Sequence, residues 1–287
     1  MDIKDKIVLI TGASSDIGAA TAKVFDKAGA KLAIAARRRE KLEEVANELH
    51  NALILETDLS DESKVAEMID ATVRHFGRID ILINNAAAII VSPAVKVISK
   101  DLLQAFKTNL IAPVIATQKV IEFMKPDNGI HIINIGSPGF MMGIPFYAPY
   151  VCSKAAFSAW TRTIQAEFGG TNIVVSEYFP GYVRTDSRPE SRIGEVEQDF
   201  LMSERQNAIT RYFTKPQSPE EIARQLLKLA QYPKPLTYSS LSVRIGAWIA
   251  LFPSFRLNLS KEMAATARRK QTNFFLALQA ESKRVNE

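Results

Sequence analysis

The chain has 287 residues, 47% hydrophobic and 23% charged, a balance that supplies a core and excludes a disordered chain. Its formal net charge of +5 fits nucleic acid, an anionic membrane surface or a phosphorylated cofactor, so charge alone selects none of these partners. A single cysteine excludes an internal disulfide and three scattered histidines argue against a zinc site, so we expect a reducing, cytoplasmic environment and no bound metal.

The two ends of the chain lack the patterns of secretion and of membrane insertion. Residues 1–6 have no apolar core of the kind that a signal peptide requires. The longest uncharged apolar stretch near the C-terminus covers residues 245–253, well short of the roughly 20 residues that a spanning helix needs. We therefore expect a chain that is neither exported nor crosses a bilayer.

Short apolar strands alternate with helical patterns from residue 7 to residue 230. The first strand, at residues 7–11, ends at Gly12 and leads into a helix at residues 17–28. The longest helical pattern runs over residues 101–124. The other predicted strands cover 31–36, 52–56, 79–84, 130–135 and 173–179, and the other predicted helices cover 40–49, 63–76, 151–168 and 219–230.

Strands that are apolar throughout and are separated by helices indicate a parallel sheet that is covered on both faces. We therefore predict an α/β fold with a single-domain, Rossmann-like, doubly wound sheet. Residues 1–235 would form this domain, including a polar, weakly periodic substrate loop at about 187–217. Residues 236–287 would form a C-terminal extension on the same domain, with a last strand at 237–243 followed by two helices.

A glycine-containing turn joins the first strand to the first helix. Residues 11–18 read Thr-Gly-Ala-Ser-Ser-Asp-Ile-Gly. A helix that starts after such a turn presents its backbone N–H groups to a pyrophosphate. Two glycines at this loose spacing also occur in simple strand-to-helix turns, so the turn alone is weak evidence. The residues expected to contact a dinucleotide here are Thr11, Gly12, Ser14, Ser15, Ile17 and Gly18.

Three arginines follow the second strand, where the adenosine ribose of a dinucleotide is expected. In proteins that bind NAD, an acidic residue about 20 residues past the glycines contacts the ribose 2′-hydroxyl. Here the residues are Arg37, Arg38 and Arg39. A guanidinium matches a 2′-phosphate in charge and geometry, so we predict NADP(H) as the cofactor, held by Arg37 and Arg38. The alternative is a solvated basic helix start, which the helix dipole disfavours.

Tyr150 and Lys154 lie four residues apart on a predicted helix, so their side chains share one face. A free phenol titrates near 10, and a nearby ammonium together with a nicotinamide would lower the pKa of Tyr150 by about 2 to 3 units. Ser137 follows the fifth predicted strand, at the edge of the sheet where ligands bind, and its hydroxyl is a donor for a developing alkoxide. A tyrosine–lysine pair is common by chance, so it gains meaning only together with other motifs.

Taken in order, these and further motifs resemble the single-domain short-chain dehydrogenases/reductases over about residues 5–230. Ser137 precedes Tyr150 by 13 residues, the usual interval of the family, which favours Tyr150 over Tyr147. The motifs that carry the resemblance are Thr11-Gly12…Gly18, Asp58, Asn84-Asn85-Ala86, Asn109, Ser137, Tyr150-x-x-x-Lys154 and Pro180-Gly181-x-Val183-x-Thr185.

The resemblance implies a hydride transfer between NADP(H) and a carbonyl or alcohol carbon. In the family a serine orients the substrate, a tyrosine transfers the proton, a lysine holds the nicotinamide ribose, and a helix asparagine supports a water-linked proton relay. These roles would fall on Ser137, Tyr150, Lys154 and Asn109. The implied cofactor contacts are Asp58 at the adenine, Asn85 near the ribose, and Val183 and Thr185 at the carboxamide, with Leu59, Ala86, Pro180 and Gly181 beside them.

Three residues depart from the family pattern. Asp16 stands where the family has a glycine, and it would weaken pyrophosphate binding unless it caps the helix and points away. Ala87 replaces the glycine that usually follows residues 84–86, and Gly136 replaces a frequent serine before Ser137. The last two changes remove no catalytic group.

The segment between Ser137 and Tyr150 is almost entirely apolar and is expected to form one wall of the substrate pocket. It favours a small apolar carbonyl or alcohol, such as a lipid or a steroid-like or retinoid-like molecule. The alternative is that these side chains only fill gaps in the core. Residues 241–287 carry eight Lys/Arg and three Glu beside Trp248 and Phe252, which fits a peripheral membrane contact, a lid or a subunit contact.

Other functions share parts of this pattern. An epimerase or dehydratase uses the same tyrosine and lysine with a tightly held NAD, but such relatives usually have another glycine spacing and a larger C-terminal domain. A non-catalytic dinucleotide-binding scaffold is disfavoured because Ser137, Tyr150, Lys154 and Asn109 are intact. Only the net charge favours nucleic acid. The helices at 101–124 and 151–168 pair in oligomers of the family, so the resemblance also implies a homodimer or homotetramer.

Overall fold

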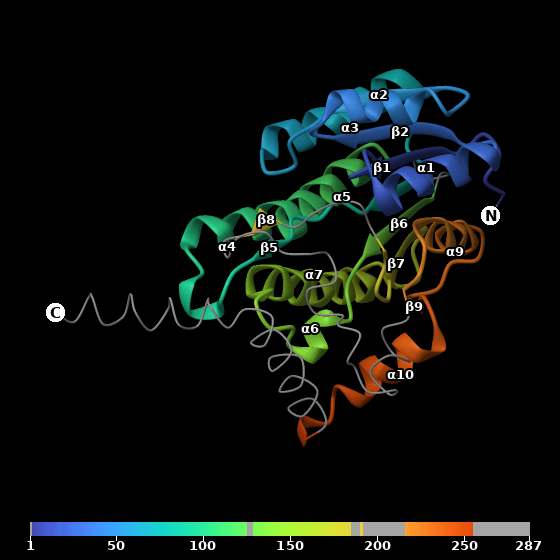
Figure 1. Cartoon of the computed structure of the whole chain (residues 1–287). Helices are drawn as coiled ribbons and strands as arrows, with labels where there is room; N and C mark the ends of the chain where they lie inside the picture. The colour runs from blue at the N-terminus through green and yellow to red at the C-terminus, as the bar shows by residue number, and fades with distance from the viewer. Residues whose placement is uncertain (1, 125–128, 185–189, 192–215, 255–287) are drawn as a thin grey trace.

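Seven strands form one parallel sheet in the order β3-β2-β1-β4-β6-β7-β9 (Figure 1). The computed structural model describes residues 2–124, 129–184, 190–191 and 216–254. The strands are β1 (Ile7–Thr11), β2 (Lys31–Ala36), β3 (Ala52–Glu56), β4 (Ile81–Asn84), β6 (Ile130–Ile135), β7 (Ile173–Phe179) and β9 (Leu236–Tyr238). Their central segments are almost wholly apolar, as a sheet buried on both faces requires.

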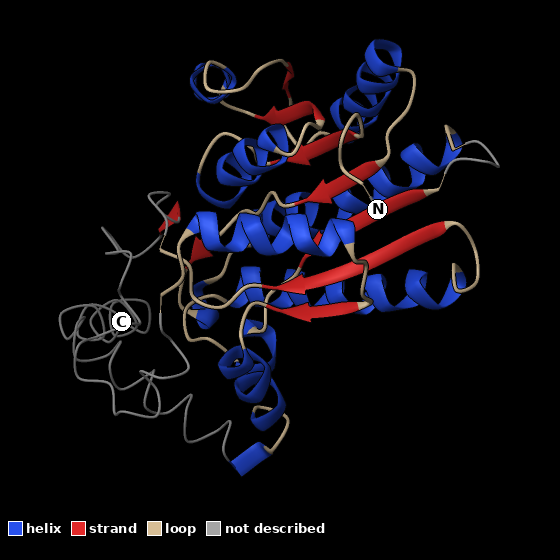
Figure 2. Ribbon diagram, turned by 90° about the vertical axis from the view of Figure 1, so that its right-hand side faces the viewer, coloured by secondary structure: helices blue, strands red, loops and turns tan. Residues whose placement is uncertain are grey.

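Helices cover both faces of this sheet (Figure 2). One layer consists of α1 (Asp16–Lys27), α2 (Arg39–Ala46) and α9 (Pro219–Gln231). The other layer consists of α3 (Glu62–Phe76), α5 (Ala112–Glu122) and α7 (Ala148–Glu167). Side chains alternate between the two layers along each strand, so that Val8 and Ile10 pack with the first layer and Leu9 with the second. The predicted Rossmann-like, doubly wound α/β fold is confirmed.

The order of the strands places a crevice at the middle of the sheet. The chain steps outward from β1 to β3 and then returns to the other side of β1 as β4. At such a reversal the loops that leave the carboxyl ends of the two strands diverge and leave room for a ligand. The loops after Thr11 and Asn84, which end β1 and β4, therefore flank the expected ligand site.

The helical pattern predicted at 101–124 is interrupted. It consists of α4 (Ser99–Phe106), a π-helical turn η2 (Lys107–Ile111) and α5. Pro113 lies at the start of α5, where its missing N–H is tolerated. A widened turn of this kind is frequent at functional sites, and this one contains Asn109.

The last predicted strand, at 237–243, is wrong in its second half. β9 ends at Tyr238, and α10 (Leu241–Ile249) begins three residues later. The Ser240 hydroxyl accepts a hydrogen bond from the Val243 N–H at 3.2 Å, so this serine starts a helix where the apolar pattern suggested a strand. The predicted helix at 151–168 begins earlier, at Ala148.

Two short elements lie outside the main sheet. The strands β5 (Ile90–Val91) and β8 (Glu190–Ser191) pair in parallel, so part of the predicted substrate loop runs beside the chain that follows β4. The short helices η1 (Ala94–Lys96) and α6 (Gly139–Met142) are the remaining elements of the described part of the chain. Most of the predicted loop at 187–217 and all residues after 254 lie outside the described residues, so the predicted domain limits stay a prediction. None of the described helices combines the length and the apolar character needed to cross a membrane.

Candidate active site

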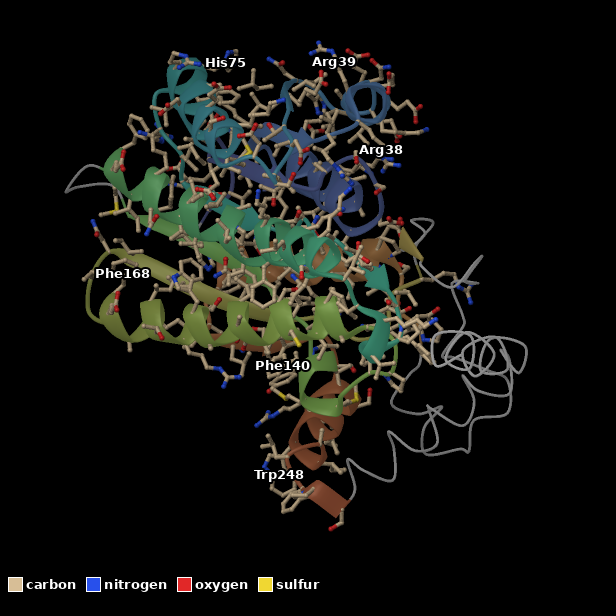
Figure 3. The ribbon with its side chains drawn as sticks, turned by 90° about the vertical axis from the view of Figure 1, so that its left-hand side faces the viewer. Arg38, Arg39, His75, Phe140, Phe168 and Trp248 are labelled. Atoms are coloured by element: carbon tan, nitrogen blue, oxygen red, sulfur yellow. The ribbon has the colours of Figure 1, made fainter. Side chains whose placement is uncertain are left out.

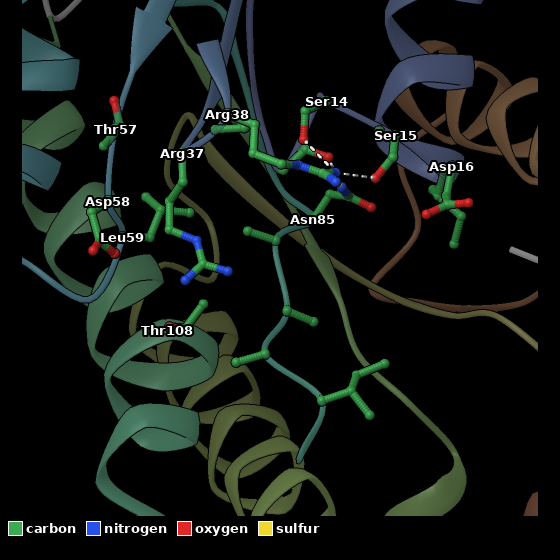
Figure 4. A pocket seen from close by; sticks show the side chains of 18 of the residues that line it. Ser14, Ser15, Asp16, Arg37, Arg38, Thr57, Asp58, Leu59, Asn85 and Thr108 are labelled. Carbon is green, nitrogen blue, oxygen red and sulfur yellow. Dashed lines mark hydrogen bonds between the residues drawn. The ribbon is translucent and has the colours of Figure 1, made fainter. Parts of the chain in front are cut away.

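A cavity of about 420 Å³ lies at the carboxyl ends of the central strands (Figure 4). Its volume is in the range of small-molecule and cofactor sites. Residues from the ends of β1, β2, β3 and β4 meet here. The predicted cofactor residues that line it are Gly12, Ser14, Ser15, Ile17, Gly18, Arg37, Arg38, Asp58, Leu59, Asn85 and Ala86.

Two glycines allow the turn after β1 to approach the chain after β4. Gly12 has a φ of +68°, and a Cβ added to it would lie 2.7 Å from the Ala86 Cα. A Cβ on Gly18 would collide with the Gly12 carbonyl oxygen. The Asn85 side chain donates to the carbonyls of Thr11 and Gly12 at 2.9 and 3.2 Å. Thr11 lies behind the turn, and its hydroxyl accepts from the Asn85 N–H at 3.0 Å.

Cationic side chains define one end of the cavity. The Arg38 guanidinium donates to the hydroxyls of Ser14 and Ser15 at 3.2 and 3.3 Å. In Figure 4 the Arg37 side chain extends from the end of β2 into the cavity. Partial burial raises the pKa of Asp58, but hydrogen bonds from Ser60 and the charge of Arg37 outweigh this and hold it below its usual value. The two guanidinium groups therefore suit an anionic group of a ligand.

Asp16 has an unexpected backbone conformation. It is the first residue of α1 with a φ of +50°, and Ser15 takes the N-cap position without a side-chain capping bond. The expectation that Asp16 caps the helix is therefore wrong, because the turn needs a left-handed residue where the family has glycine. Aspartate is one of the few other residue types that adopt this conformation readily. Asp16 also lines the cavity.

Ser137, Tyr150 and Lys154 meet where β6 ends against α7. Ser137 is nearly buried, and its hydroxyl accepts from the Gly139 N–H at 3.1 Å. Burial raises the pKa of Tyr150, and a hydrogen bond from Ser137 only partly opposes it. Lys154 is 2% exposed and its ammonium donates to the Ile135 carbonyl at 2.7 Å. Burial lowers the pKa of Lys154 to about 8.

The predicted lowering of the Tyr150 pKa depends on the charge of a nicotinamide as well as on Lys154, and it stays a prediction. Burial disfavours the phenolate, and the ammonium that was expected to compensate is bonded to the Ile135 carbonyl instead. A phenol in this state holds its proton, which is the form that an acid catalyst needs.

Asn109 connects three parts of the site. Its side-chain oxygen accepts from the Ala88 N–H at 2.6 Å, and its amide donates to the Ala88 carbonyl at 3.0 Å. The same amide donates to the Ser153 hydroxyl at 2.9 Å, and Ser153 in turn donates to the Tyr150 carbonyl at 2.8 Å. Asn109 therefore fixes the chain after β4 against the start of α7, where Tyr150 lies.

The predicted carboxamide contacts follow β7, next to the end of β6. The Gly181 N–H donates to the Ser239 hydroxyl at 2.8 Å, and a Cβ on Gly181 would lie 2.7 Å from Val243. Val183 forms a β-bridge with Gln217. Pro180, Gly181 and Val183 are thus at the same edge of the sheet as Ser137 but outside the lining of the 420 Å³ cavity. Thr185 lies outside the described residues.

Apolar side chains gather at the end of the site away from the arginines. Phe140 on α6 contacts Phe179 edge to face, with ring centroids 6.0 Å apart. In Figure 3, Phe140 and Trp248 of α10 lie toward the opposite end of the molecule from Arg38. Trp248 is exposed, as is Cys152 on α7.

Several residues that line the cavity were not predicted from the sequence. Ala87 to Ile90 follow directly after the Asn84-Asn85-Ala86 motif, and Thr108 precedes Asn109, so extending both motifs by a few residues would have found them. Gln104 comes one helical turn before Thr108 and follows from the same reasoning. Within the described residues, no cluster of three or more His, Cys, Asp or Glu side chains is placed to hold a metal ion.

Known proteins resemble this chain in sequence and in fold. The family profile described as "short chain dehydrogenase" matches residues 6–195. An uncharacterized oxidoreductase, YxnA, of Bacillus subtilis is 32% identical over 88% of this chain and 70% of its own length. Dehydrogenase/reductase SDR family member 7B of Danio rerio is 30% identical over 94% of this chain and 88% of its own length.

Solved structures share the fold. A short-chain dehydrogenase from Burkholderia cenocepacia, solved in complex with NADP, has a TM-score of 0.71 and 23% identity, and the match covers 83% of this chain and 97% of that one. A short-chain dehydrogenase/reductase from Serratia marcescens also has a TM-score of 0.71, with 24% identity over 85% of this chain and 100% of that one.

Proposed function

The chain belongs to the short-chain dehydrogenase family, and we propose that it is an NADP(H)-dependent oxidoreductase that transfers a hydride between the nicotinamide and a carbonyl or secondary alcohol carbon. The observation that carries the proposal is the meeting of Ser137, Tyr150 and buried Lys154 where β6 ends against α7, at the same edge of the sheet as the 420 Å³ cavity. Asn109 is proposed to support the proton relay that returns a proton to the Tyr150 phenolate.

Each side chain has a defined part in the proposed reduction. NADPH, when bound, supplies the hydride. Ser137 donates a hydrogen bond to the carbonyl oxygen of the substrate and holds it beside Tyr150. The Tyr150 phenol, which burial keeps protonated, gives its proton to that oxygen as negative charge develops there. Lys154 carries the positive charge that stabilises the resulting phenolate.

The preference for NADP(H) is supported by the cationic end of the cavity. Arg37 and Arg38 both line it, and Arg38 is already held by Ser14 and Ser15 in the turn after β1. A 2′-phosphate would accept charge-assisted hydrogen bonds from these groups, whereas the 2′-hydroxyl of NAD would lack the acidic partner that usually recognises it. The rest of the cofactor is proposed to contact the residues that the sequence predicts for it. These residues lie in the turn after β1 and in the segments that follow β3, β4 and β7.

The substrate is proposed to be a small apolar carbonyl or alcohol. This is supported by the apolar segment between Ser137 and Tyr150 and by the packing of Phe140 on Phe179. A homodimer or homotetramer in the cytoplasm, without a nucleic-acid partner, completes the proposal. A contact of α10 with a membrane surface is a lesser proposal, supported by exposed Trp248 and Phe252.

A panel of aliphatic, aromatic and steroid-like carbonyls, assayed for consumption of NADPH and of NADH, tests the proposal. We expect carbonyl-dependent NADPH consumption and much slower NADH consumption. Tyr150→Phe should lower the rate by about 10² to 10⁴ because the proton donor is lost, while NADPH binding by fluorescence titration stays unchanged. Undiminished turnover by the variant would overturn the mechanism, and a preference for NADH would overturn the cofactor assignment alone.

A further inference from the structure

A buried carboxylate lies behind the proposed catalytic lysine. Glu177 is in the middle of β7 and is only 1% exposed. It faces α7, where Lys154, Ser158 and Arg162 follow one another at intervals of four residues and so form one stripe. One carboxylate oxygen, Oε2, is 3.9 Å from the Arg162 Nε, and the other, Oε1, has no hydrogen-bond partner among the described residues.

Burial of the Glu177 carboxylate costs free energy, and packing alone does not explain why a carboxylate stands at this position. A charge in the interior of a sheet is unfavourable unless it is paired, and an apolar side chain would fill the same space without this cost. Burial raises the pKa of Glu177 to about 7, while the Ser158 hydroxyl and the positive charges of Arg162 and Lys154 oppose the rise. The carboxylate is therefore retained in a place where only the Ser158 hydroxyl and the cations Arg162 and Lys154 favour it.

Gly136 makes room for this carboxylate. A Cβ at position 136 would collide with the Phe179 ring and would lie 3.0 Å from the Glu177 Oε1. Gly136 is also the residue between Ile135, whose carbonyl accepts from Lys154, and Ser137. The serine that is frequent at this position in the family would not fit here. Glu177 thus reaches the short segment that holds both Lys154 and Ser137.

The charge of Glu177 acts on Lys154. Lys154 is buried, and burial favours loss of its proton, whereas the negative charge of Glu177 opposes that loss. Among the residues that the structure describes, the other charged or titratable groups that face Glu177 are Arg162 from α7 and Tyr238 from β9, with Arg244 of α10 near Tyr238. Arg162 is half exposed, so its charge is screened by water, and the Tyr238 pKa is raised by burial. Lys154 is the only one of these partners that is fully buried together with Glu177.

We propose that Glu177 is a positioning residue whose buried carboxylate keeps Lys154 in its ammonium form against the Ile135 carbonyl, in a space that Gly136 leaves open. The inference rests on the proposed function for the catalytic role of Lys154, but its statement about the lysine proton requires no substrate. It assigns a role to Glu177 and Gly136, which have none in the proposed reaction.

The protonation of Lys154 is measured by ¹³C NMR titration of the lysine side chains, with Lys154→Met to assign the signal. Glu177→Gln removes the charge and keeps the shape, so we expect the midpoint of Lys154 to fall by about one pH unit. The matched control is Glu167→Gln, which removes the same charge from the exposed end of α7 and should leave the midpoint unchanged. An unchanged midpoint in Glu177→Gln would overturn the proposal.

A second titration does not depend on the folding of Glu177→Gln. The carboxyl signal of Glu177 is followed in the wild-type chain and in Lys154→Met. Because two interacting groups shift one another, loss of the ammonium should raise the midpoint of Glu177. A midpoint that does not move would contradict the proposal as directly as the first experiment.

Measurements of activity against pH distinguish a failure of this proposal from a failure of the proposed function. Above both midpoints, a shift of one pH unit leaves about tenfold less protonated Lys154, so kcat/KM of Glu177→Gln should fall about tenfold further below wild type at alkaline pH than at pH 6. Glu177→Asp should restore part of the loss. A pH profile identical to wild type would refute the role of Glu177. A wild-type chain without turnover on any carbonyl would refute the proposed function and leave the titrations decisive for Glu177.

Discussion

Single residues decide how the turn after β1 is built. Gly12 and Asp16 both have positive φ values, +68° and +50°, but only the first is a glycine. A sequence pattern identifies the turn by its glycines, so the conformation of Asp16 could not be predicted from a residue that also favours helix caps. The structure explains why a glycine is usual there and why aspartate is a tolerated replacement.

Replacing Asp16 separates the effect of its charge from the effect of its conformation. Asp16→Gly and Asp16→Ala both remove the carboxylate from the cavity, so both should bind NADPH at least as tightly as wild type in a fluorescence titration. Only glycine adopts the positive φ freely, so Asp16→Gly should be more stable to urea than Asp16→Ala by about 1 kcal/mol. A marked loss of NADPH affinity in both variants would mean that Asp16 has a structural part in the site.

At the scale of elements, apolar periodicity predicted nearly every strand and helix of the sheet and its two layers. It failed where a side chain, rather than burial, determines the backbone. Ser240 starts α10 inside a predicted strand, and η2 interrupts a helix whose apolar pattern continues through it. The tyrosine, the lysine and the serine of the site were found by their spacing. Glu177 was not, because no local spacing links a strand residue to the helix stripe that it faces, and Gly136 was noted only as a departure from the family pattern.

The π-helical turn is tied to the rest of the site by one side chain. Asn109→Ala would leave the N–H and the carbonyl of Ala88 without their partners, so we expect a loss of about 3 kcal/mol in the free energy of unfolding and a large loss of activity. Lys107→Ala, in the same turn but exposed, is the control and should change stability by less than about 0.5 kcal/mol. Equal urea midpoints for the two variants would contradict this account of η2.

In the molecule as a whole, polar side chains cross the interior of an otherwise apolar sheet. Asn84 donates to Asn134 at 2.9 Å, and Asn134 donates to Thr161 at 3.0 Å, which joins β4, β6 and α7. His131 is fully buried on β6 at 2.8 Å from the Ser176 hydroxyl. Burial lowers the pKa of His131 to about 4. The folded chain therefore favours the neutral form of His131, and protonation of this histidine lowers the stability of the fold.

The buried His131 predicts a loss of stability in acid. Its pKa is 6.5 in the unfolded chain and about 4 in the folded chain, so between these values the unfolded chain binds more protons and is favoured as pH falls. From pH 7 to pH 4.5 this contribution should cost about 2.4 kcal/mol in the free energy of unfolding, measured with urea. His131→Gln should show a smaller fall. The pKa of Glu177 is raised in the folded chain, so this residue stabilises the fold as pH falls, equally in the wild type and in His131→Gln. Equal falls in the free energy of unfolding of the two proteins would therefore refute the account of His131.

The exposed position of Cys152 has a practical consequence. It is the only thiol in 287 residues, and it lies on α7 between the two members of the Tyr150 and Lys154 pair. A maleimide dye would thus attach at one known place in the whole chain, next to the chemistry. Such a covalent reporter would make the arrival of a nucleotide visible as a change in emission, on a protein that needs no engineered attachment point.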